Sequence, residues 1–313
     1  MTCSACQKKP VYTTQSHTKL CKQHFLAYFE KKVFRTIRNY QLLRDDDIVV
    51  CALSGGKDST TVTYLVNSIL KQRRKKVTAL LINEGIHGYR DSTLKDAKQF
   101  CRQEGIVLKE ISFKKLFGFT LDEFLKTHKD INPCSVCGVI RRYLMNRGAR
   151  ELGATVLVTG HNLDDEAQNI LMNQFKGNMQ FSAKLGPVSG ALEHEKFVRK
   201  VKPLYFMPEK EVALYAYLKQ FPVEFIECPN SHGTFRQYVG DLVNKLEQTY
   251  PGTKQSIINS FLSILPELKK QYHGKKIGSC TICGEAAAKQ LCKVCELLEK
   301  EKMYRTRTKK SDL

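Results

Sequence analysis

Short apolar segments alternate with segments of helical periodicity through the first half of this chain, and this alternation restricts the possible folds more than any other feature. The apolar segments predict strands over residues 47–53, 77–83, 106–112 and 154–159. The spacing of apolar residues predicts helices over residues 25–43, 61–70, 91–103, 120–128, 137–152 and 164–175. Apolar strands that are joined by helices form a parallel sheet covered on both faces. The sequence therefore predicts an α/β fold with a doubly wound parallel sheet.

The second half of the chain departs from this alternation. Pro208 predicts the start of a helix that runs to about residue 218. The apolar segment 223–226 is interpreted as a short strand that leads to Cys228. Two further helices are expected, and the second contains Pro266, which should bend or split it. These two helices cover residues 236–248 and 255–270.

The chain carries a large excess of basic residues, with 51 Lys and Arg against 31 Asp and Glu and a formal net charge of +20. Such an excess favours a polyanionic partner, and nucleic acid is the expected one. No apolar run approaches the ~20 residues that cross a membrane, and the N-terminal sequence MTCSACQKKP lacks the apolar region of a secretory signal. We therefore expect a cytoplasmic protein that binds no membrane.

Most of the twelve cysteines occur in pairs separated by two residues. In an intracellular chain, such pairs indicate metal ligands rather than disulfides. Four ligands near each terminus, with no open position, are typical of structural Zn²⁺. The two groups are Cys3, Cys6, Cys21 and His24, and Cys280, Cys283, Cys292 and Cys295. The expected organisation is a zinc finger over 1–24, a main domain over 25–270 that ends in a helical part, and a zinc ribbon with a basic tail over 271–313.

The sequence SGGKDS, residues 54–59, lies between the first predicted strand and the helix that follows it. Its glycines permit positive φ and a close approach of the backbone to a ligand. The start of the helix offers free N–H groups and the positive end of its dipole, while Lys57, Ser54 and Ser59 add a charge and hydroxyl donors. The loop therefore predicts a phosphate site. It matches neither GxxxxGK[ST] nor GxGxxG, so neither a γ-phosphate-cleaving NTPase nor a dinucleotide site is expected.

Several motifs in the main domain resemble those of one family. SGGKDS resembles the PP-loop of ATP pyrophosphatases, which cut ATP between the α and β phosphates. TGHNLDD at 159–165 is similar to a motif of the tRNA-modifying members, and PCSVCG at 133–138 is similar to the CxxC motif of the 2-thiolating branch. With the paired terminal metal groups, residues 1–300 resemble the TtuA-type tRNA 2-thiouridine synthetases and the cytosolic tRNA 2-thiolation proteins.

The resemblance implies that one ATP lies between the loops that follow the first and fourth strands, where a doubly wound sheet binds its ligands. By resemblance, Asp58 and Asp165 are catalytic, and Asp165 helps to hold the nucleotide and its Mg²⁺. From the residues alone, Asp165 could instead be a helix N-cap, a place that Asp164 could equally take. His161 could be catalytic or structural, and a structural hydrogen bond is favoured. The residues implied to bind the nucleotide are Ala52, Leu53, Ser54, Gly55, Gly56, Lys57, Asp58, Ser59, Ile82, Gly160 and Asp165.

Three central cysteines lack a fourth partner: Cys134 and Cys137 form one pair, and Cys228 stands in the sequence ECP. Three thiolates can hold Zn²⁺ with a water, hold a [4Fe–4S] cluster with one open iron, or carry sulfur as persulfide and disulfide. The resemblance implies the [4Fe–4S] cluster. Arg141 follows Cys137 by one turn, where some relatives carry lysine. Because arginine stays protonated, Arg141 is expected to stabilise a phosphate or an oxyanion rather than to act as a base.

The resemblance implies synthesis of 2-thiouridine in tRNA. ATP would adenylate the C2 carbonyl oxygen of a uridine with release of pyrophosphate, and sulfur would then replace AMP. The implied sulfur donor is a ubiquitin-like carrier protein with a C-terminal thiocarboxylate, and a homodimer is left open. Two alternatives remain: a tRNA 2-thiocytidine synthetase, and a zinc-ribbon nucleic-acid-binding protein with an inactive nucleotide site. The motifs do not distinguish a T-loop uridine from the wobble uridine as the target.

Overall fold

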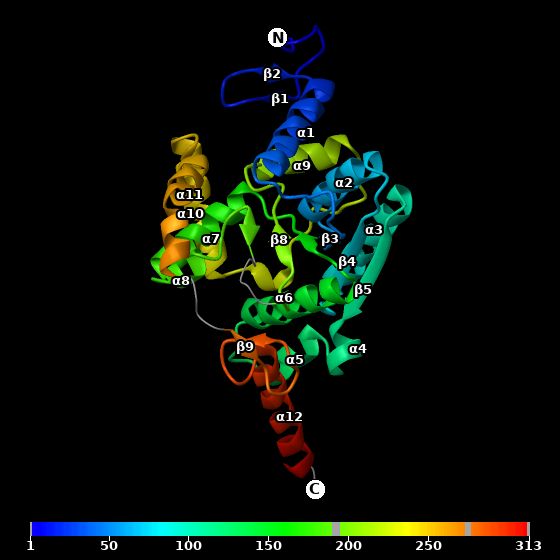
Figure 1. Ribbon diagram of the computed structural model, residues 1–313, viewed down its shortest axis with the longest axis vertical. Coiled ribbons are helices and arrows are strands. Elements are labelled where there is room, and N and C mark those ends of the chain that lie inside the picture. Colours follow the sequence, from blue (N-terminus) through cyan, green and yellow to red (C-terminus); the bar gives the residue numbers. More distant parts are fainter. Residues whose placement is uncertain (1, 190–194, 273–276, 312–313) are drawn as a thin grey trace.

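A six-stranded sheet forms the centre of the computed structural model, which describes residues 2–189, 195–272 and 277–311 (Figure 1). The strand order is β5-β4-β3-β6-β8-β7, and all neighbours are parallel except β7 and β8. The predicted doubly wound sheet is therefore confirmed, with β7 and β8 as additional strands. The strands are β3 (Val49–Ala52), β4 (Thr78–Asn83), β5 (Val107–Ser112), β6 (Val156–Val158), β7 (Val188–Ser189) and β8 (Arg199–Val201).

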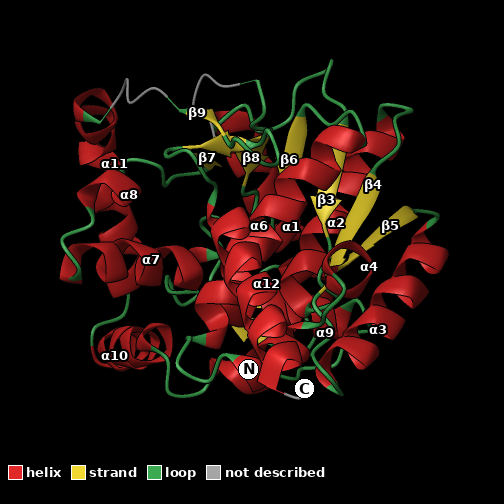
Figure 2. Ribbon diagram, turned by 90° about the horizontal axis from the view of Figure 1, so that it is seen from below, coloured by secondary structure: helices red, strands yellow, loops and turns green. Residues whose placement is uncertain are grey.

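Successive residues of a strand point to opposite faces of the sheet. Both faces of this sheet carry apolar side chains, and helices cover both. Val49, Cys51 and Val156 pack in one core with the helices of the first layer, whereas Val50 and Leu157 pack in a second core with the helices of the other layer. Figure 2 shows the helices around the strands of the sheet. The first layer consists of α1 (Lys22–Asn39), α2 (Lys57–Gln72), α3 (Tyr89–Glu104) and α9 (Glu209–Leu218). The second layer contains α4 (Phe113–Phe117), α5 (Leu121–Thr127) and α6 (Pro133–Glu151).

The sheet has its topological switch between β3 and β6. The chain passes outward from β3 to β4 and β5, and it then returns to form β6 on the other side of β3. The loops that leave β3 and β6 therefore diverge at the same edge of the sheet, where open α/β folds bind their ligands.

Four helices pack against one another beside the sheet (Figure 1). They are α7 (Leu163–Phe175), α8 (Met179–Ser182), α10 (Phe235–Thr249) and α11 (Thr253–Gln271). Pro266 lies inside α11 and does not split it. Burial of Phe261 and Leu265 against the neighbouring helices offsets the missing backbone hydrogen bond.

The segment 223–226, predicted as a strand, forms none and is followed by the short helix η1 (Pro229–Ser231). Phe225 and Ile226 are 60% and 43% exposed, so the apolar residues do not mark a buried strand. Contacts to α3 hold the segment instead: the Glu224 amide donates to Asp96 Oδ2 at 3.1 Å, and Ser92 donates to the Glu224 carboxylate.

The two cysteine-rich modules lie at opposite ends of the molecule (Figure 1). Each contains one short hairpin, β1 (Tyr12–Thr13) with β2 (Lys19–Leu20), and β9 (Gly278–Ser279) with β10 (Ala286–Ala287). The Tyr12 hydroxyl donates to Glu211 on α9, and Arg150 on α6 pairs with Glu285, so each module is tied to the main domain. The helix α12 (Lys293–Ser311) follows the second hairpin.

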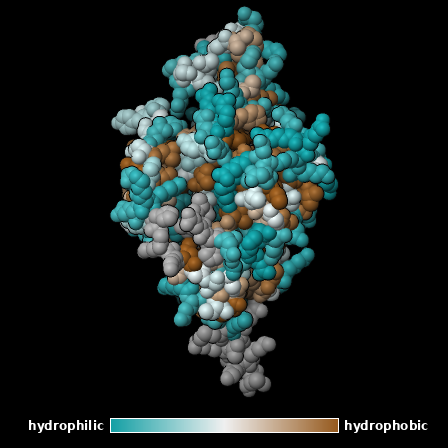
Figure 3. Space-filling view, in the orientation of Figure 1, coloured by the Kyte–Doolittle hydropathy of each residue, from teal (hydrophilic) through white to brown (hydrophobic). Residues whose placement is uncertain are grey.

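The surface agrees with the composition. Hydrophilic residues dominate the face in Figure 3, and apolar residues form only small groups there. Among the described residues, no helix has both the length and the apolar content needed to cross a bilayer.

Candidate active site

The phosphate loop, residues 54–59, connects β3 to α2. The helix begins at Lys57, four residues before its predicted start, so Asp58 and Ser59 lie in its first turn. Gly56 is the N-cap and supplies no side-chain acceptor, and Gly55 has φ +87°. The Ser54 amide donates to Ser59 Oγ at 3.0 Å, which fixes the loop. Free amides and the helix dipole therefore converge on a site suited to an anion.

The second loop, residues 159–162, connects β6 to α7 and packs directly on the phosphate loop. A Cβ on Gly160 would lie 2.8 Å from the Ser59 nitrogen, so only glycine fits there. Asn162 Nδ2 donates to Asp58 Oδ1 at 3.0 Å and joins the two loops through side chains. Asn162 and Asp165 form a capping box at the start of α7. Asp165 thus serves the helix end, although Asn162 is the N-cap residue itself.

A cavity of about 290 Å³ lies between these loops. All the residues predicted to bind the nucleotide line it except Gly55 and Lys57, and it also takes in Arg141, Met145, Thr159 and His161. Lys57 turns away: its Nζ lies 2.7 Å from Glu209 Oε1 and 3.0 Å from Asp58 Oδ2. The predicted residues are thus brought together, apart from the lysine side chain and Gly55.

Burial controls the charges around the cavity. It raises the pKa of Asp58, although Lys57 and Asn162 oppose the shift, and it raises the pKa of Asp165. Desolvation beside the cavity, followed by the charge of Lys202, lowers the pKa of His161, although the residue itself is exposed to solvent. Its Nδ1 lies 3.0 Å from Thr159 Oγ1, which is the geometry expected of a structural hydrogen bond. Asp58 and Asp165 both line this cavity, so their carboxyl oxygens could bind one cation between them, and its charge would offset the effect of burial.

The three central cysteines converge beside this cavity. Cys134 and Cys137 lie in the first turn of α6, which begins at Pro133 instead of the predicted Cys137, and Cys228 directly precedes η1. Cys134 Sγ lies 3.2 Å from the carbonyl of Asn230 in η1. After burial, the Cys228 thiol is the next cause of the raised pKa of Cys134, and it also contributes to the raised pKa of Cys137.

The spacing of these three thiols differs from that of the terminal groups. In the described part of the chain, two groups of ligand atoms lie within 4.8 Å of one another, and both are terminal. The thiols of Cys134, Cys137 and Cys228 are partly accessible and come from two segments of the chain. They are not among the groups within 4.8 Å, so their spacing fits a bound group larger than one metal ion. The residues present therefore suit an iron–sulfur cluster with three protein ligands.

Arg141 connects the cysteines to the cavity. It lies one turn beyond Cys137 on α6 and lines the nucleotide cavity. Its Nε lies 3.0 Å from Glu84 Oε1, and Glu84 follows β4 directly. Sequence reasoning missed Glu84, because a single glutamate after a strand carries no motif.

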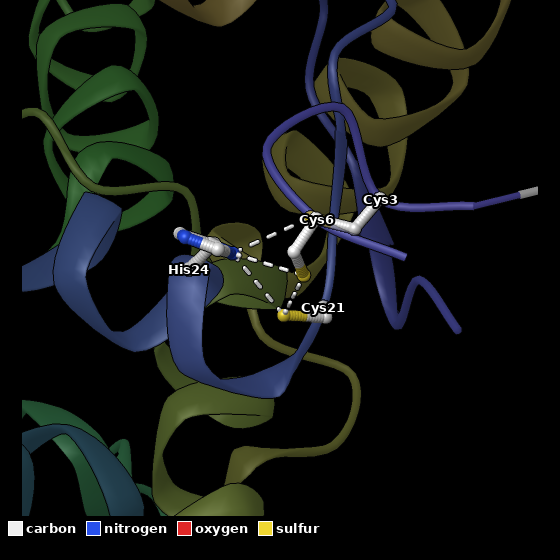
Figure 4. A group of neighbouring side chains, drawn as sticks. All are labelled: Cys3, Cys6, Cys21 and His24. Atoms are coloured by element: carbon white, nitrogen blue, oxygen red, sulfur yellow. Dashed lines mark hydrogen bonds between the residues drawn. The ribbon is translucent and has the colours of Figure 1, made fainter. Parts of the chain in front are cut away.

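Each terminal group has the geometry of a tetrahedral metal site. Bonds of ~2.3 Å to sulfur and ~2.0 Å to nitrogen place two sulfurs ~3.8 Å apart and a sulfur and a nitrogen ~3.5 Å apart. His24 Nδ1 lies 3.5, 3.6 and 3.3 Å from the sulfurs of Cys3, Cys6 and Cys21 (Figure 4). Cys6 and Cys21 are 3.7 Å apart, as are Cys283 and Cys292. Both groups could therefore hold a metal ion with all four positions filled by protein.

Comparison with known proteins adds independent findings. The PP-loop domain family matches residues 26–237. The tRNA 2-thiolation protein NcsA of Haloferax volcanii is 36% identical, with 96% of this chain and 98% of that protein covered. The tRNA-5-methyluridine(54) 2-sulfurtransferase of Pyrococcus horikoshii is also 36% identical, with 96% and 95% covered. The cytoplasmic tRNA 2-thiolation protein 1 of Danio rerio is 34% identical, with 95% and 87% covered.

One solved structure matches over almost the whole chain. The U34-tRNA thiolase NcsA from Methanococcus maripaludis, solved with its [4Fe–4S] cluster, is 38% identical and superposes with a TM-score of 0.82. The match covers 96% of each chain, so it includes both terminal modules as well as the main domain.

Proposed function

This chain belongs to the PP-loop family of tRNA 2-thiolation sulfurtransferases, and from that premise we propose that it makes 2-thiouridine in tRNA in an ATP-dependent reaction. The observation that carries the proposal is the position of the three-cysteine site beside the nucleotide cavity, with Arg141 on the rim of both. A nucleotide and a sulfur-bearing group can therefore act on one base. Neither a zinc-ribbon binding protein nor a dead nucleotide site requires this arrangement.

The phosphate loop and the second loop would carry the first half of the reaction. The free amides at the start of α2 and the hydroxyls of Ser54 and Ser59 would hold the phosphates of ATP. Asp58 and Asp165 would hold Mg²⁺, which neutralises phosphate charge. The O2 atom of the uridine attacks the α phosphorus, the bond from that phosphorus to the bridging oxygen breaks, and pyrophosphate leaves. The carbonyl oxygen thereby becomes part of a good leaving group, AMP.

The three cysteines would carry the second half. A [4Fe–4S] cluster on Cys134, Cys137 and Cys228 would offer one iron without a protein ligand as a binding place for sulfur. Arg141 supplies a permanent positive charge beside this place. Sulfur forms a bond to C2 of the uridine, the bond from C2 to the original oxygen breaks, and AMP leaves with that oxygen. The guanidinium of Arg141 stabilises the negative charge that develops on the departing phosphate.

The partners follow from the charge and the family. The net charge of +20 suits tRNA, and we propose a ubiquitin-like carrier with a C-terminal thiocarboxylate as the sulfur donor. Similarity to the cytoplasmic protein of Danio rerio supports a cytoplasmic location. A homodimer remains a prediction that the mass of the complex in solution would test.

The decisive experiment is mass spectrometry of tRNA nucleosides after incubation with ATP, a sulfide source and the anaerobically reconstituted chain. We expect 2-thiouridine or its 5-methyl derivative. Relatives named for positions 34 and 54 are 38% and 36% identical, so similarity does not separate the two targets and fragment mapping of the tRNA assigns the position. Formation of 2-thiocytidine would support the alternative enzyme, and no thiolated nucleoside at all would contradict the proposal.

ATP should be converted to AMP and pyrophosphate during turnover. The reason is that the PP-loop replaces a Walker-type loop, so the α phosphate and not the γ phosphate is attacked. Chromatography of ATP labelled on the α phosphate separates the products. ADP as the main labelled product would contradict the adenylation step, and a Ser54→Ala variant that keeps its melting temperature provides the low-turnover control.

We further propose that the ion at each terminal group is Zn²⁺. A purified chain should then contain about two zinc ions, as measured by elemental analysis. Cys280→Ser removes one ligand and should reduce the zinc content by about half, because a closed tetrahedral site fails when a ligand is lost. Thr281→Ala, next in sequence and exposed, is the matched control. A stable, active chain without zinc would contradict the structural role.

A further inference from the structure

A buried carboxylate links the phosphate loop to the three-cysteine site. Glu84 is 1% exposed and lies between two arginines. Its Oε2 is 2.7 Å from Arg90 Nη2, and its Oε1 is 3.0 Å from Arg141 Nε. A buried charge is costly unless it is paired. The carboxylate is therefore ion-paired with both guanidinium groups, although neither contact has the angles of a hydrogen bond.

The Arg90 end of this link reaches the phosphate loop. Arg90 is 2% exposed, and its Nη1 donates to the Ser54 carbonyl at 2.7 Å. The same nitrogen lies 3.1 Å from Thr93 Oγ1. A Cβ on Gly55 would lie only 2.1 Å from the Thr93 carbonyl oxygen. The start of the phosphate loop is thus seated on the first turns of α3 through Arg90.

The Arg141 end reaches the cysteines. The Arg141 side chain is 40% exposed, lines the nucleotide cavity and lies one helical turn from Cys137 on α6. The Glu84 backbone is fixed as well, because its carbonyl accepts from the Leu121 amide at 2.8 Å. A partly exposed arginine has many rotamers, and its pairing with a buried, immobile carboxylate selects one of them.

We propose that Glu84 is a positioning residue for the sulfurtransferase reaction, holding the Arg141 guanidinium on the rim shared by the nucleotide cavity and the three-cysteine site. There the guanidinium faces the phosphate of the adenylated uridine when sulfur arrives and AMP departs. Arg90 holds the start of the phosphate loop in place through its hydrogen bond to the Ser54 carbonyl. This inference rests on the proposed function, because the charge that Arg141 meets is the one that AMP release creates.

The test is a double-mutant cycle on the full, iron-loaded chain with Glu84→Gln, Arg141→Ala and the double variant. Glu84→Gln should lower kcat for thiolation about 100-fold, the cost of misplacing a catalytic group by an ångström. The KM for ATP should stay close to that of the unchanged chain, because Arg90 keeps its own hydrogen bonds to the Ser54 carbonyl and to Thr93. Iron content and the calorimetric ATP affinity of the iron-free chain should stay unchanged as well. Because Glu84 acts through Arg141, the double variant should be no slower than Arg141→Ala alone.

Two further variants separate positioning from folding. Asp47 and Arg199 form another largely buried ion pair, with Asp47 Oδ2 2.6 Å from Arg199 Nη2. Asp47 precedes β3, away from the phosphate loop, so Asp47→Asn is the matched control and should keep kcat. Glu84→Asp retains the charge but shortens the reach by one methylene. It should keep the melting temperature and still lose kcat, which covers the case in which Glu84→Gln does not fold.

The outcomes are distinct. The positioning role would be overturned if the kcat losses of Glu84→Gln and Arg141→Ala multiplied in the double variant. Full kcat in a folded Glu84→Asp chain would overturn it as well. Equal losses of melting temperature and kcat in Glu84→Gln and Asp47→Asn would also overturn it, in favour of a purely structural role. Failure of the unchanged chain to thiolate tRNA would count against the proposed function, not against the link through Glu84.

Discussion

Replacing Cys137 by serine should strip the iron from the anaerobically reconstituted chain and stop thiolation, while ATP still binds. Each thiolate supplies one third of the protein anchorage, and a serine hydroxyl is a poor ligand for iron. The nucleotide cavity is lined by other residues, so its affinity for ATP should be retained. The visible absorption spectrum, an iron count of about four in the unchanged chain and calorimetric titration with ATP provide the three measurements.

The three cysteines should be equivalent in this respect. Cys134→Ser and Cys228→Ser are expected to give the same loss as Cys137→Ser. Ser135→Ala is the matched control, because it changes an exposed residue in the same turn of α6 and leaves all three thiols in place. Persulfide chemistry predicts a different pattern, in which two cysteines matter more than the third and the iron-free chain thiolates fully. That result would end the cluster proposal while leaving ATP-dependent thiolation in place.

Replacing Asp58 by alanine should give the second large loss, about 100-fold or more in kcat/KM for ATP-dependent thiolation. The change removes a proposed Mg²⁺ ligand, and it also removes the acceptor of the Asn162 amide and a partner of Lys57. The two loops around the nucleotide would thus lose both their metal and their side-chain link. Release of pyrophosphate, followed by a coupled colorimetric assay, measures the effect directly.

Asp91→Ala is the control for Asp58→Ala. Asp91 also lies in the first turn of a helix, but its side chain is 78% exposed and lies outside the cavity. A loss from Asp58→Ala that matched the loss from Asp91→Ala would show only the general effect of an acidic residue at a helix start. Retained pyrophosphate release in a folded Asp58→Ala chain would contradict the assignment of Asp58.

The sheet and the phosphate loop could be predicted because their signals are local. Buried parallel strands need continuous apolar runs, which β3, β4 and β6 have, while β5 at the sheet edge keeps apolar residues only at some positions. The loop signal consists of adjacent glycines, serines and a lysine between a strand and a helix. By contrast, β8 contains Arg199 and Lys200 in only three residues, and such a short polar segment is indistinguishable from a loop before its pairing with β6 is known.

The missed parts of the site depend on contacts between distant segments. Glu84 acquires its place only when α3 and α6 bring Arg90 and Arg141 to it. Lys57 was expected at the phosphates, but Glu209, 152 residues further along the chain, draws its side chain out of the cavity. The segment around Phe225 was misassigned because apolar composition alone does not show that the side chains face solvent.

The close approach of Gly160 to the backbone of Asp58 and Ser59 has a consequence for nucleotide affinity. The two loops are in close backbone contact and are also joined by Asn162, so each restrains the other. An incoming nucleotide therefore meets a receptor that is already shaped, and little conformational entropy is lost when it binds. A more flexible site would spend part of the binding energy on ordering its own loops. Here that energy remains available for holding the uridine and the α phosphate in line for attack.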